Sequence, residues 1–557
     1  MKKFSLTLLS ILYSSLLFTQ TIEGKWLFES ILSENNPTTE NIKPIKEGDF
    51  MLIQNDGTFN YEISEISLIA AGNWEISKNT LVFHYIQPTD TTRVYKINYS
   101  ENNLTLSENG INFLFKKAPL NKNNNAFSIT NIGKGALGIF CLLFIAFAFS
   151  RNRKAINWQL VFKGLLIQIL FALLILKAPF VQDGFEWVSS IFVTILGFTR
   201  EGSLFLFGDL VEDINSFGFI FAFQVLPTIL FFSALTSLLF YYGILQKVVY
   251  GFAVFMKKIL NLSGSESLAA AGNIFLGQTE SPLLIKPYIN NMTMSELLCL
   301  MAGGMATIAG GVLAAYIGFL GGSDPVQQLF FAKHLLAASV MSAPAAIISA
   351  KILLPETEEI STDMVISEEQ IGTNALEAIS IGTTQGLKLA VNVGAMLLVF
   401  IAFISMANYF LNDFIGEFTG VNTWVNSMTN GQYTGLTLQF ILGYILAPLT
   451  WVMGVCSQDM ILVGQLLGEK TILNEFVAYV SLGELQASGK FFEQKSIIIA
   501  TYILCGFANF SSIGIQIGGI GVLAPKRRRD LSKLGILALI AGTLASLFTA
   551  VIVGMIL

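Results

Sequence analysis

The sequence predicts a polytopic α-helical membrane protein that carries a small all-β domain at its N-terminus. Long apolar stretches recur from about residue 130 to the C-terminus. Of the 557 residues, 53% are hydrophobic and 13% are charged, whereas soluble domains average about 25% charged residues. The formal net charge of −5 gives no reason to expect a nucleic-acid partner. The expected partner of most of the chain is therefore the lipid bilayer.

The first 20 residues have the layout of a cleaved secretory signal. Lys2 and Lys3 precede an apolar run from Leu6 to Phe18, and polar sequence follows. This run is shorter than the roughly 20 residues that a spanning helix needs. We therefore expect residues 1–20 to be a signal peptide; the alternative is a first membrane anchor.

Residues 21–117 are expected to form the β domain, because the apolar helix pattern is absent there. Short alternating runs, such as residues 95–99, are separated by turn signals, such as Asn55-Asp56-Gly57. The opening Gly24-Lys25-Trp26 resembles the start of a lipocalin-like module. Trp26 and Trp74 are interpreted as core aromatics of this barrel rather than as ligand contacts. Residues 118–129, which include the polar run Asn121 to Asn125, are expected to be a linker.

Basic residues beside the apolar segments predict the orientation of the membrane domain, which we place at residues 130–557. Cytoplasmic loops carry an excess of lysine and arginine, so Arg151 to Lys154 and Lys526 to Arg529 mark the inside. The β domain then lies outside, in the periplasm of a bacterial inner membrane. Residues 184–210 are expected to lie in the membrane interface. Eight spanning helices are expected at about residues 130–150, 157–178, 216–242, 294–320, 327–353, 388–411, 495–522 and 532–555.

Polar residues interrupt the apolar pattern between Gly272 and Pro282, where Gln278, Thr279 and Glu280 stand in a row. An ionisable side chain at membrane depth is costly and normally faces a cavity, a partner or a substrate. Broken backbone at that depth is tolerated only where it lines an enclosed or watery cavity. This segment therefore predicts a transporter's binding site.

The second half of the membrane domain repeats this pattern, because the apolar stretch Leu438 to Gly454 leads into Asn474-Glu475. Glycine-interrupted segments at corresponding positions of two halves indicate a transport site at the bilayer midplane. The predicted orientations make the repeat inverted, so Glu280 and Glu475 are expected to face one cavity from opposite sides. The alternative is that the glycines mediate close helix packing and that each glutamate reaches water at a span end.

Three stretches resemble the signature sequences of the concentrative nucleoside transporter family: Asn273–Glu280, Asn474–Tyr479 and Cys505–Ile513. The likeness covers about residues 130–557 and includes Val225–Thr228 and His334–Pro344. It implies a secondary active symporter that imports nucleosides, with eight core helices, two re-entrant hairpins and a homotrimeric assembly. The lipocalin-like domain departs from the family pattern, and the resemblance does not give its ligand or role.

The resemblance also implies the site residues. The nucleobase would be contacted by Gln278, Thr279, Glu280 and Val312, and the ribose by Glu475, Asn509 and Ser512, with Phe507 beside it. A coupling sodium ion would be held by the side chains of Asn273 and Thr307 and the carbonyl groups of Leu276 and Ile308. Purine or pyrimidine preference stays open, and no other cofactor is expected.

Other functions are kept open. Proton-coupled import would need a titratable relay, and sodium is favoured because the implied ligands are neutral oxygen atoms. Against a nucleoside-sensing receptor, the sequence has no cytoplasmic domain large enough to pass on a signal. Against a membrane enzyme, it offers no evident nucleophile or metal cluster. His334 is expected to be an interfacial or packing residue, and His84 is given no role. The four cysteines are not spaced as metal ligands or as a disulfide framework.

Overall fold

A computed structural model describes residues 24–33, 49–53, 58–63, 68–77, 80–87, 89, 91–99, 103–108, 110–117, 129–213, 220–322, 324–361, 363–364, 372–429, 432–488 and 490–557. The chain divides into two compact units, Met1–Asn124 and Asn125–Leu557, and each is described by itself. The expected signal peptide and residues 118–128 of the expected linker lie outside the described residues.

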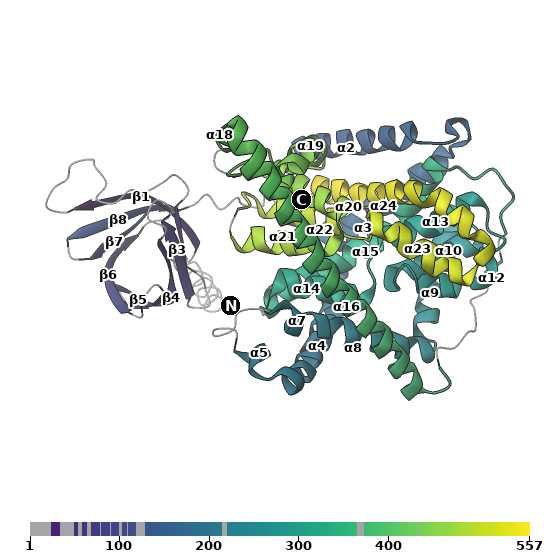
Figure 1. The fold of residues 1–557 in the computed structure, drawn as a ribbon, viewed down its shortest axis with the longest axis horizontal. Helices are drawn as coiled ribbons and strands as arrows, with labels where there is room; N and C mark the ends of the chain where they lie inside the picture. Colours follow the sequence, from purple (N-terminus) through teal and green to yellow (C-terminus); the bar gives the residue numbers. More distant parts are fainter. Residues whose placement is uncertain are drawn as a thin grey trace, which may run out of the picture. The chain divides into compact units, whose positions relative to one another are not determined.

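The first unit is a closed barrel of eight antiparallel strands in sequence order, drawn in purple and dark blue in Figure 1. Strand β1 pairs with β2 on one side and with β8 on the other, so that Trp26 lies opposite both Met51 and Lys117. Closure leaves no unpaired edge strand that another chain could extend. The strands are β1 (Gly24–Ser33), β2 (Phe50–Ile53), β3 (Thr58–Ile63), β4 (Leu68–Ser77), β5 (Thr80–Gln87), β6 (Thr91–Tyr99), β7 (Asn103–Glu108) and β8 (Ile111–Lys117).

Aromatic side chains occupy much of the barrel interior and line a cavity of about 110 Å³ within it. Trp26 is 1% exposed, and Trp74 is partly buried against the same core. The rings of Phe59 and Phe83 stack with their centroids 4.0 Å apart. The prediction that both tryptophans are core residues is therefore confirmed.

The second unit is helical throughout. Its longer helices are α2 (Ile129–Ala148), α3 (Trp158–Lys177), α4 (Pro179–Phe207), α8 (Leu226–Tyr241), α9 (Ile244–Leu260), α15 (Pro325–Leu353), α16 (Ala375–Asn408), α19 (Leu438–Val452) and α24 (Arg528–Ile556). A π-helix, η3 (Tyr409–Gly416), continues α16. Short helical pieces connect these elements: η2 (Arg153–Ala155), α5 (Asp209–Glu212), α7 (Phe221–Gln224), α12 (Lys286–Ile289), α17 (Glu417–Thr419), α18 (Val421–Met428) and η4 (Pro525–Arg527).

Two helix pairs and two helical hairpins are treated together below because they meet at the candidate site. The pairs are α13 (Met294–Ala306) with α14 (Gly310–Gly321), and α22 (Gln494–Leu504) with α23 (Phe510–Leu523). The hairpins are α10 (Gly264–Phe275) with α11 (Ser281–Leu284), and α20 (Met460–Ile472) with α21 (Glu475–Ala487).

Eight helical stretches of the described chain are long and apolar enough to cross a bilayer, but they are not the eight that the sequence predicts. The expected span 495–522 is divided into α22 and α23, each too short to be counted. Helix α4 is counted instead, because it runs unbroken for 29 residues. Length and composition alone do not place a helix in a membrane, so the interfacial position expected for residues 184–210 stays a prediction.

Three apolar stretches form the centre of the helical unit. In an apolar 18-residue segment of each, 83% of the residues of Met294–Gly321, 89% of those of α15 and 83% of those of α24 are buried, against 17% for α4. Helix α24, yellow in Figure 1, packs against α15, α13 and α2. A helix that is apolar on all sides is expected in such an interior, and the exposed apolar faces of α4 and α16 are left for lipid or for another subunit.

Candidate substrate site

The first hairpin reverses direction between α10 and α11 through residues 276–280. Helix α10 begins with a capping box, in which Ser263 and Glu266 satisfy each other's backbone N–H groups. At the turn, the Glu280 carboxylate accepts the backbone N–H of Gly277 at 3.0 Å. The carboxylate thus braces the turn that presents Gln278 and Thr279.

The second hairpin reverses between α20 and α21 through two residues, Leu473 and Asn474. The Asn474 side chain caps α21 by accepting the backbone N–H of Val477 at 2.9 Å. Glu475 is therefore the first residue of a helix, where a carboxylate is favoured by the helix dipole. It is buried, with 4% of its surface exposed.

Two interrupted helices pack together between the hairpins. The first break separates α13 from α14 at residues 307–309, and the second separates α22 from α23 at residues 505–509. Gly506 has φ of +101°, which side chains rarely allow. A Cβ atom at Gly506 would also lie 2.6 Å from the backbone of Ala306. Glycine at this position therefore permits both the break and the close contact between the two halves.

A cavity of about 270 Å³ lies where the hairpins and the interrupted helices meet. Across it, the Asn509 amide donates to the Glu475 carboxylate at 2.5 Å. The Gln278 amide donates to the Ser512 hydroxyl at 3.2 Å, joining residues of the first and second halves. All eight residues predicted to bind substrate line this cavity: Gln278, Thr279, Glu280, Val312, Glu475, Phe507, Asn509 and Ser512.

Two of the residues expected to hold a cation, Asn273 and Thr307, lie close together beside α13. The Oδ1 atom of Asn273 is buried and has no hydrogen-bond partner, while its Nδ2 atom donates to the Leu300 carbonyl at 3.4 Å. The Thr307 hydroxyl donates to the Gly303 carbonyl at 2.9 Å, and a Cβ atom at Gly303 would meet the Asn273 amide at 2.6 Å. Asn273 and Thr307 therefore both lie against Gly303. Leu276 and Ile308, whose carbonyl groups are the other expected ligands, are buried as well.

A buried oxygen atom without a hydrogen-bond partner, such as Asn273 Oδ1, is suited to bind a cation. The neighbouring hydroxyl and the carbonyl groups at the helix break are neutral oxygen donors, which suit a hard monovalent ion. Among the described residues no group of three or more His, Cys, Asp or Glu side chains could hold a metal ion. The donor set thus resembles a sodium site more than a site for a transition metal.

Comparison with known proteins agrees with this architecture. Residues 137–210 and 334–554 match the models of the N-terminal and C-terminal parts of a Na+ dependent nucleoside transporter, and residues 222–323 match a model described as Gate: Nucleoside recognition. The chain is 42% identical over 423 residues to an uncharacterized transporter of Haemophilus influenzae, covering 75% of this chain and 96% of that protein. The chain belongs to the concentrative nucleoside transporter family. This membership places it among transporters rather than enzymes.

Characterised relatives and solved structures point the same way. Sodium/nucleoside cotransporter 1 of Rattus norvegicus is 39% identical over 433 residues, which cover 75% of this chain and 62% of that protein. A solved structure of CNTnw in an inward-facing substrate-bound state matches with a TM-score of 0.68 and 38% identity, covering 76% of this chain and 99% of that one. The transporter match does not extend over the barrel; residues 22–106 match a lipocalin-like domain model instead.

One wall of the cavity was not foreseen from the sequence. This wall is formed by four residues of α16: Leu389, Asn392, Val393 and Met396. The helix is apolar and unbroken, so it lacks the interruption that marks the other walls. Asn392, a polar residue within an apolar run, was the available signal.

The two histidines lie outside the cavity lining. His334 is buried in the helical unit, with its Nδ1 atom 3.3 Å from the Tyr502 hydroxyl and its ring against Phe330. This is the packing role expected for it. His84 lies on the barrel surface, 3.0 Å from the Thr92 hydroxyl.

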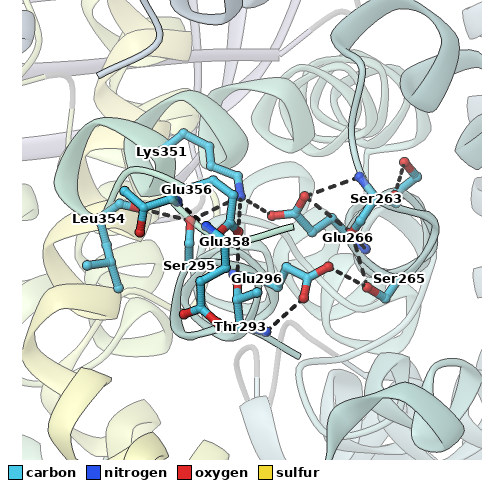
Figure 2. Close-up of polar contacts among 12 residues, drawn as sticks. Ser263, Ser265, Glu266, Thr293, Ser295, Glu296, Lys351, Leu354, Glu356 and Glu358 are labelled. Atoms are coloured by element: carbon cyan, nitrogen blue, oxygen red, sulfur yellow. Dashed lines mark hydrogen bonds and ion pairs between the residues drawn. The ribbon is translucent and has the colours of Figure 1, made fainter. Parts of the chain in front are cut away.

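A buried charge cluster, also missed from the sequence, joins the starts of α10 and α13 to the end of α15 (Figure 2). The Lys351 ammonium forms ion pairs with Glu266 and, at 3.3 Å, with Glu356. It also donates to the Ser295 hydroxyl at 3.0 Å. Like α10, α13 begins with a capping box, formed by Thr293 and Glu296. The lysine therefore ties together the bases of the first hairpin and of the first interrupted helix.

Glu356 follows the end of α15 in the polar segment after the span. Burial opposes its ionisation, but the Lys351 ammonium and the Thr293 hydroxyl together hold its pKa below the ordinary value of 4.5. A lowered pKa in the fold means that the carboxylate's contribution to stability is fully present above the ordinary pKa. That contribution is lost as the pH falls through the lowered value.

We predict that Lys351→Met destabilises the protein by about 3–5 kcal/mol, because it leaves the Glu266 carboxylate buried without its counter-charge. Lys333→Met is the matched control: its ion pair with Glu186 is partly exposed and is worth about 0–1 kcal/mol. Unfolding of the purified protein in detergent measures both. Equal stability of the two variants would contradict the anchoring role of Lys351.

Proposed function

We propose that this chain is a sodium-coupled symporter that imports nucleosides, working as a homotrimer in a bacterial inner membrane. The observation that carries the proposal is the single cavity in which Glu280 and Glu475, from opposite halves of the chain, line the wall together. Relatives named as sodium/nucleoside cotransporters support both the substrate class and the ion.

The chemistry of the two walls suits a neutral nucleoside. Ribose hydroxyls can donate hydrogen bonds to the Glu475 carboxylate. The Asn509 amide has both donor and acceptor groups. The nucleobase edge would meet Gln278, Thr279 and Glu280, with Val312 against its face. Such polar pairing gives specificity, because an analogue without a hydroxyl leaves buried groups of the site unpaired.

Coupling would come from a sodium ion beside α13. Its ligands would be Asn273 and Thr307 through their side chains, and Leu276 and Ile308 through their carbonyl groups. Binding the ion there would hold the hairpin against the first interrupted helix, in the geometry that presents Gln278 and Glu280 to the base. Proton-coupled import is the second candidate, since buried carboxylates could also carry a proton.

The domain arrangement completes the proposal. Residues 1–20 would be a signal peptide, 21–117 a periplasmic lipocalin-like domain, 118–129 a linker and 130–557 the transporter, with eight spanning helices and two re-entrant hairpins. Positively charged loops that include Arg151 to Lys154 support this orientation. The exposed apolar face of α16 offers surface for subunit contacts.

We predict that Glu280→Gln and Glu475→Gln each reduce nucleoside uptake roughly 10- to 100-fold, because a buried hydrogen bond to a carboxylate contributes about 1.5–3 kcal/mol. Uptake of radiolabelled uridine and adenosine into proteoliposomes measures the effect. Glu359→Gln, on the exposed segment after α15, is the control and should behave like the unmodified protein. Near-normal uptake by either cavity variant would remove that carboxylate from the site.

We further predict that uptake follows an imposed sodium gradient and not a pH gradient. Asn273→Ala should raise the sodium concentration for half-maximal uptake roughly tenfold, as expected for the loss of one ligand worth about 1.4 kcal/mol. Uptake that proceeds without sodium and collapses on adding a protonophore would favour proton coupling instead.

Finally, the barrel should be dispensable for transport, because it forms a compact unit of its own and the transporter match does not extend over it. A shortened chain that joins the signal sequence to the transporter near Asn124 should insert with the same topology and transport at a similar rate per molecule. A shortened protein that inserts and assembles yet does not transport would show that the barrel gates or feeds the site.

A further inference from the structure

Lys470 is the most deeply buried charge whose role the proposed transport mechanism leaves unexplained. It lies on α20, in the second hairpin, and none of its surface is exposed. Its ammonium group donates to the carbonyl groups of Ile503 and Cys505, at 2.9 and 3.2 Å, and to the Ser546 hydroxyl at 3.1 Å. Three donors thus meet three neutral oxygen acceptors.

The environment of this ammonium is unusual for a buried lysine. In the part of the chain that the structure describes, Lys470 forms no ion pair, whereas Lys351, which is buried but slightly more exposed, pairs with two carboxylates. The Glu475 carboxylate acts on the Lys470 ammonium only from beyond ion-pair distance. Burying a charge without a directly paired counter-charge is costly. Carbonyl and hydroxyl oxygens at the end of an interrupted helix are instead the surroundings that transporters give to a bound cation.

The position of Lys470 matches that of Asn273 in the other half. Helix α10 ends at Phe275 and α20 ends at Ile472, so each residue stands two positions before the last residue of its hairpin helix. Each faces the interrupted helix of its own half: Asn273 contacts α13 through the Leu300 carbonyl, and Lys470 contacts the end of α22. The difference is that the Asn273 Oδ1 atom lacks a partner, while the Lys470 site is filled by its own ammonium.

We propose that the Lys470 ammonium is a built-in cation, which does in the second half what the coupling sodium does in the first. It ties the second hairpin to the helix break. Lys470 stands five residues before Glu475, and the Cys505 carbonyl that it contacts stands four residues before Asn509. The Glu475–Asn509 pair, on the ribose side of the cavity, is thereby fixed without a bound ion. Only the nucleobase side then depends on sodium. This inference rests on the proposed function, because it assigns the two sides to ribose and base.

The test measures equilibrium binding of uridine and adenosine, each beside its 2′,3′-dideoxy analogue, to the purified full-length protein over a range of sodium concentrations. Lys470→Met keeps an unbranched side chain, one heavy atom shorter, and removes its charge. We expect it to weaken nucleoside binding roughly ten- to a hundredfold at saturating sodium, because hydroxyl bonds to the mispositioned pair are lost. Dideoxy analogues should be affected little, and the half-saturating sodium concentration should not change.

Two other variants separate this role from general damage. Ser546→Ala removes one of the three acceptors and should weaken discrimination between nucleoside and dideoxy analogue in the same direction by a smaller factor, which decides the case if Lys470→Met does not fold. Thr471→Val is the neutral control, since the Thr471 hydroxyl bonds only to Leu467 of its own helix.

Asn273→Ala should show the opposite pattern to Lys470→Met, with a changed sodium requirement and unchanged discrimination at saturating sodium. The inference is overturned if Lys470→Met and Ser546→Ala keep full discrimination, or if either mainly shifts the sodium requirement. Failure of the unmodified protein to bind nucleosides, or to distinguish the dideoxy analogues, would instead contradict the proposed function and the inference with it.

Discussion

The architecture depends on the contact between two helix breaks. Backbone groups inside a membrane protein must be satisfied internally, so a helix can be interrupted there only where something else takes up the exposed carbonyl and N–H groups. The breaks after α13 and α22 lie against each other through Gly506 and Ala306. In the second half, the Lys470 ammonium takes up the carbonyl groups of Ile503 and Cys505 at the break; in the first half, the Asn273 side chain contacts α13 at the Leu300 carbonyl, before the break.

This arrangement separates anchoring from recognition. Lys351 and its carboxylates hold the bases of α10 and α13, while Gln278 and Glu475 stand at the opposite ends of their hairpin segments, where they line the cavity. Helix α15 and helix α24 fill the space around both breaks. The buried ammonium groups of Lys351 and Lys470 are therefore held by oxygen atoms away from the cavity lining, while the wall presents two carboxylates, Glu280 and Glu475, with amide and hydroxyl groups that a neutral polar solute can satisfy.

Much of the site could be predicted from the sequence, because an ionisable side chain at membrane depth is costly and stands out in apolar sequence. Glu280 and Glu475 interrupt apolar sequence, and all the residues expected beside them line one cavity. What could not be predicted came from packing. The Lys351 cluster joins residues about 55 to 90 positions apart, and the apolar face of α16 becomes a cavity wall only through the fold. The span 495–522 looked continuous because glycine is tolerated in membrane helices, yet Gly506 breaks it. The barrel strands were foreseen from alternation, and the barrel itself from the likeness to a lipocalin-like module; the register by which β1 closes on β8 could not be read from the sequence.

The most direct test of the account is a structure of the full-length protein in lipid with sodium and a bound nucleoside. We expect the ribose hydroxyls within hydrogen-bond distance, about 3 Å, of Glu475 and Asn509, with the base edge on Gln278 and Thr279. A nucleoside bound in the reverse orientation, or at another cavity while this one holds no ligand, would contradict the central claim that the two hairpins form one substrate site.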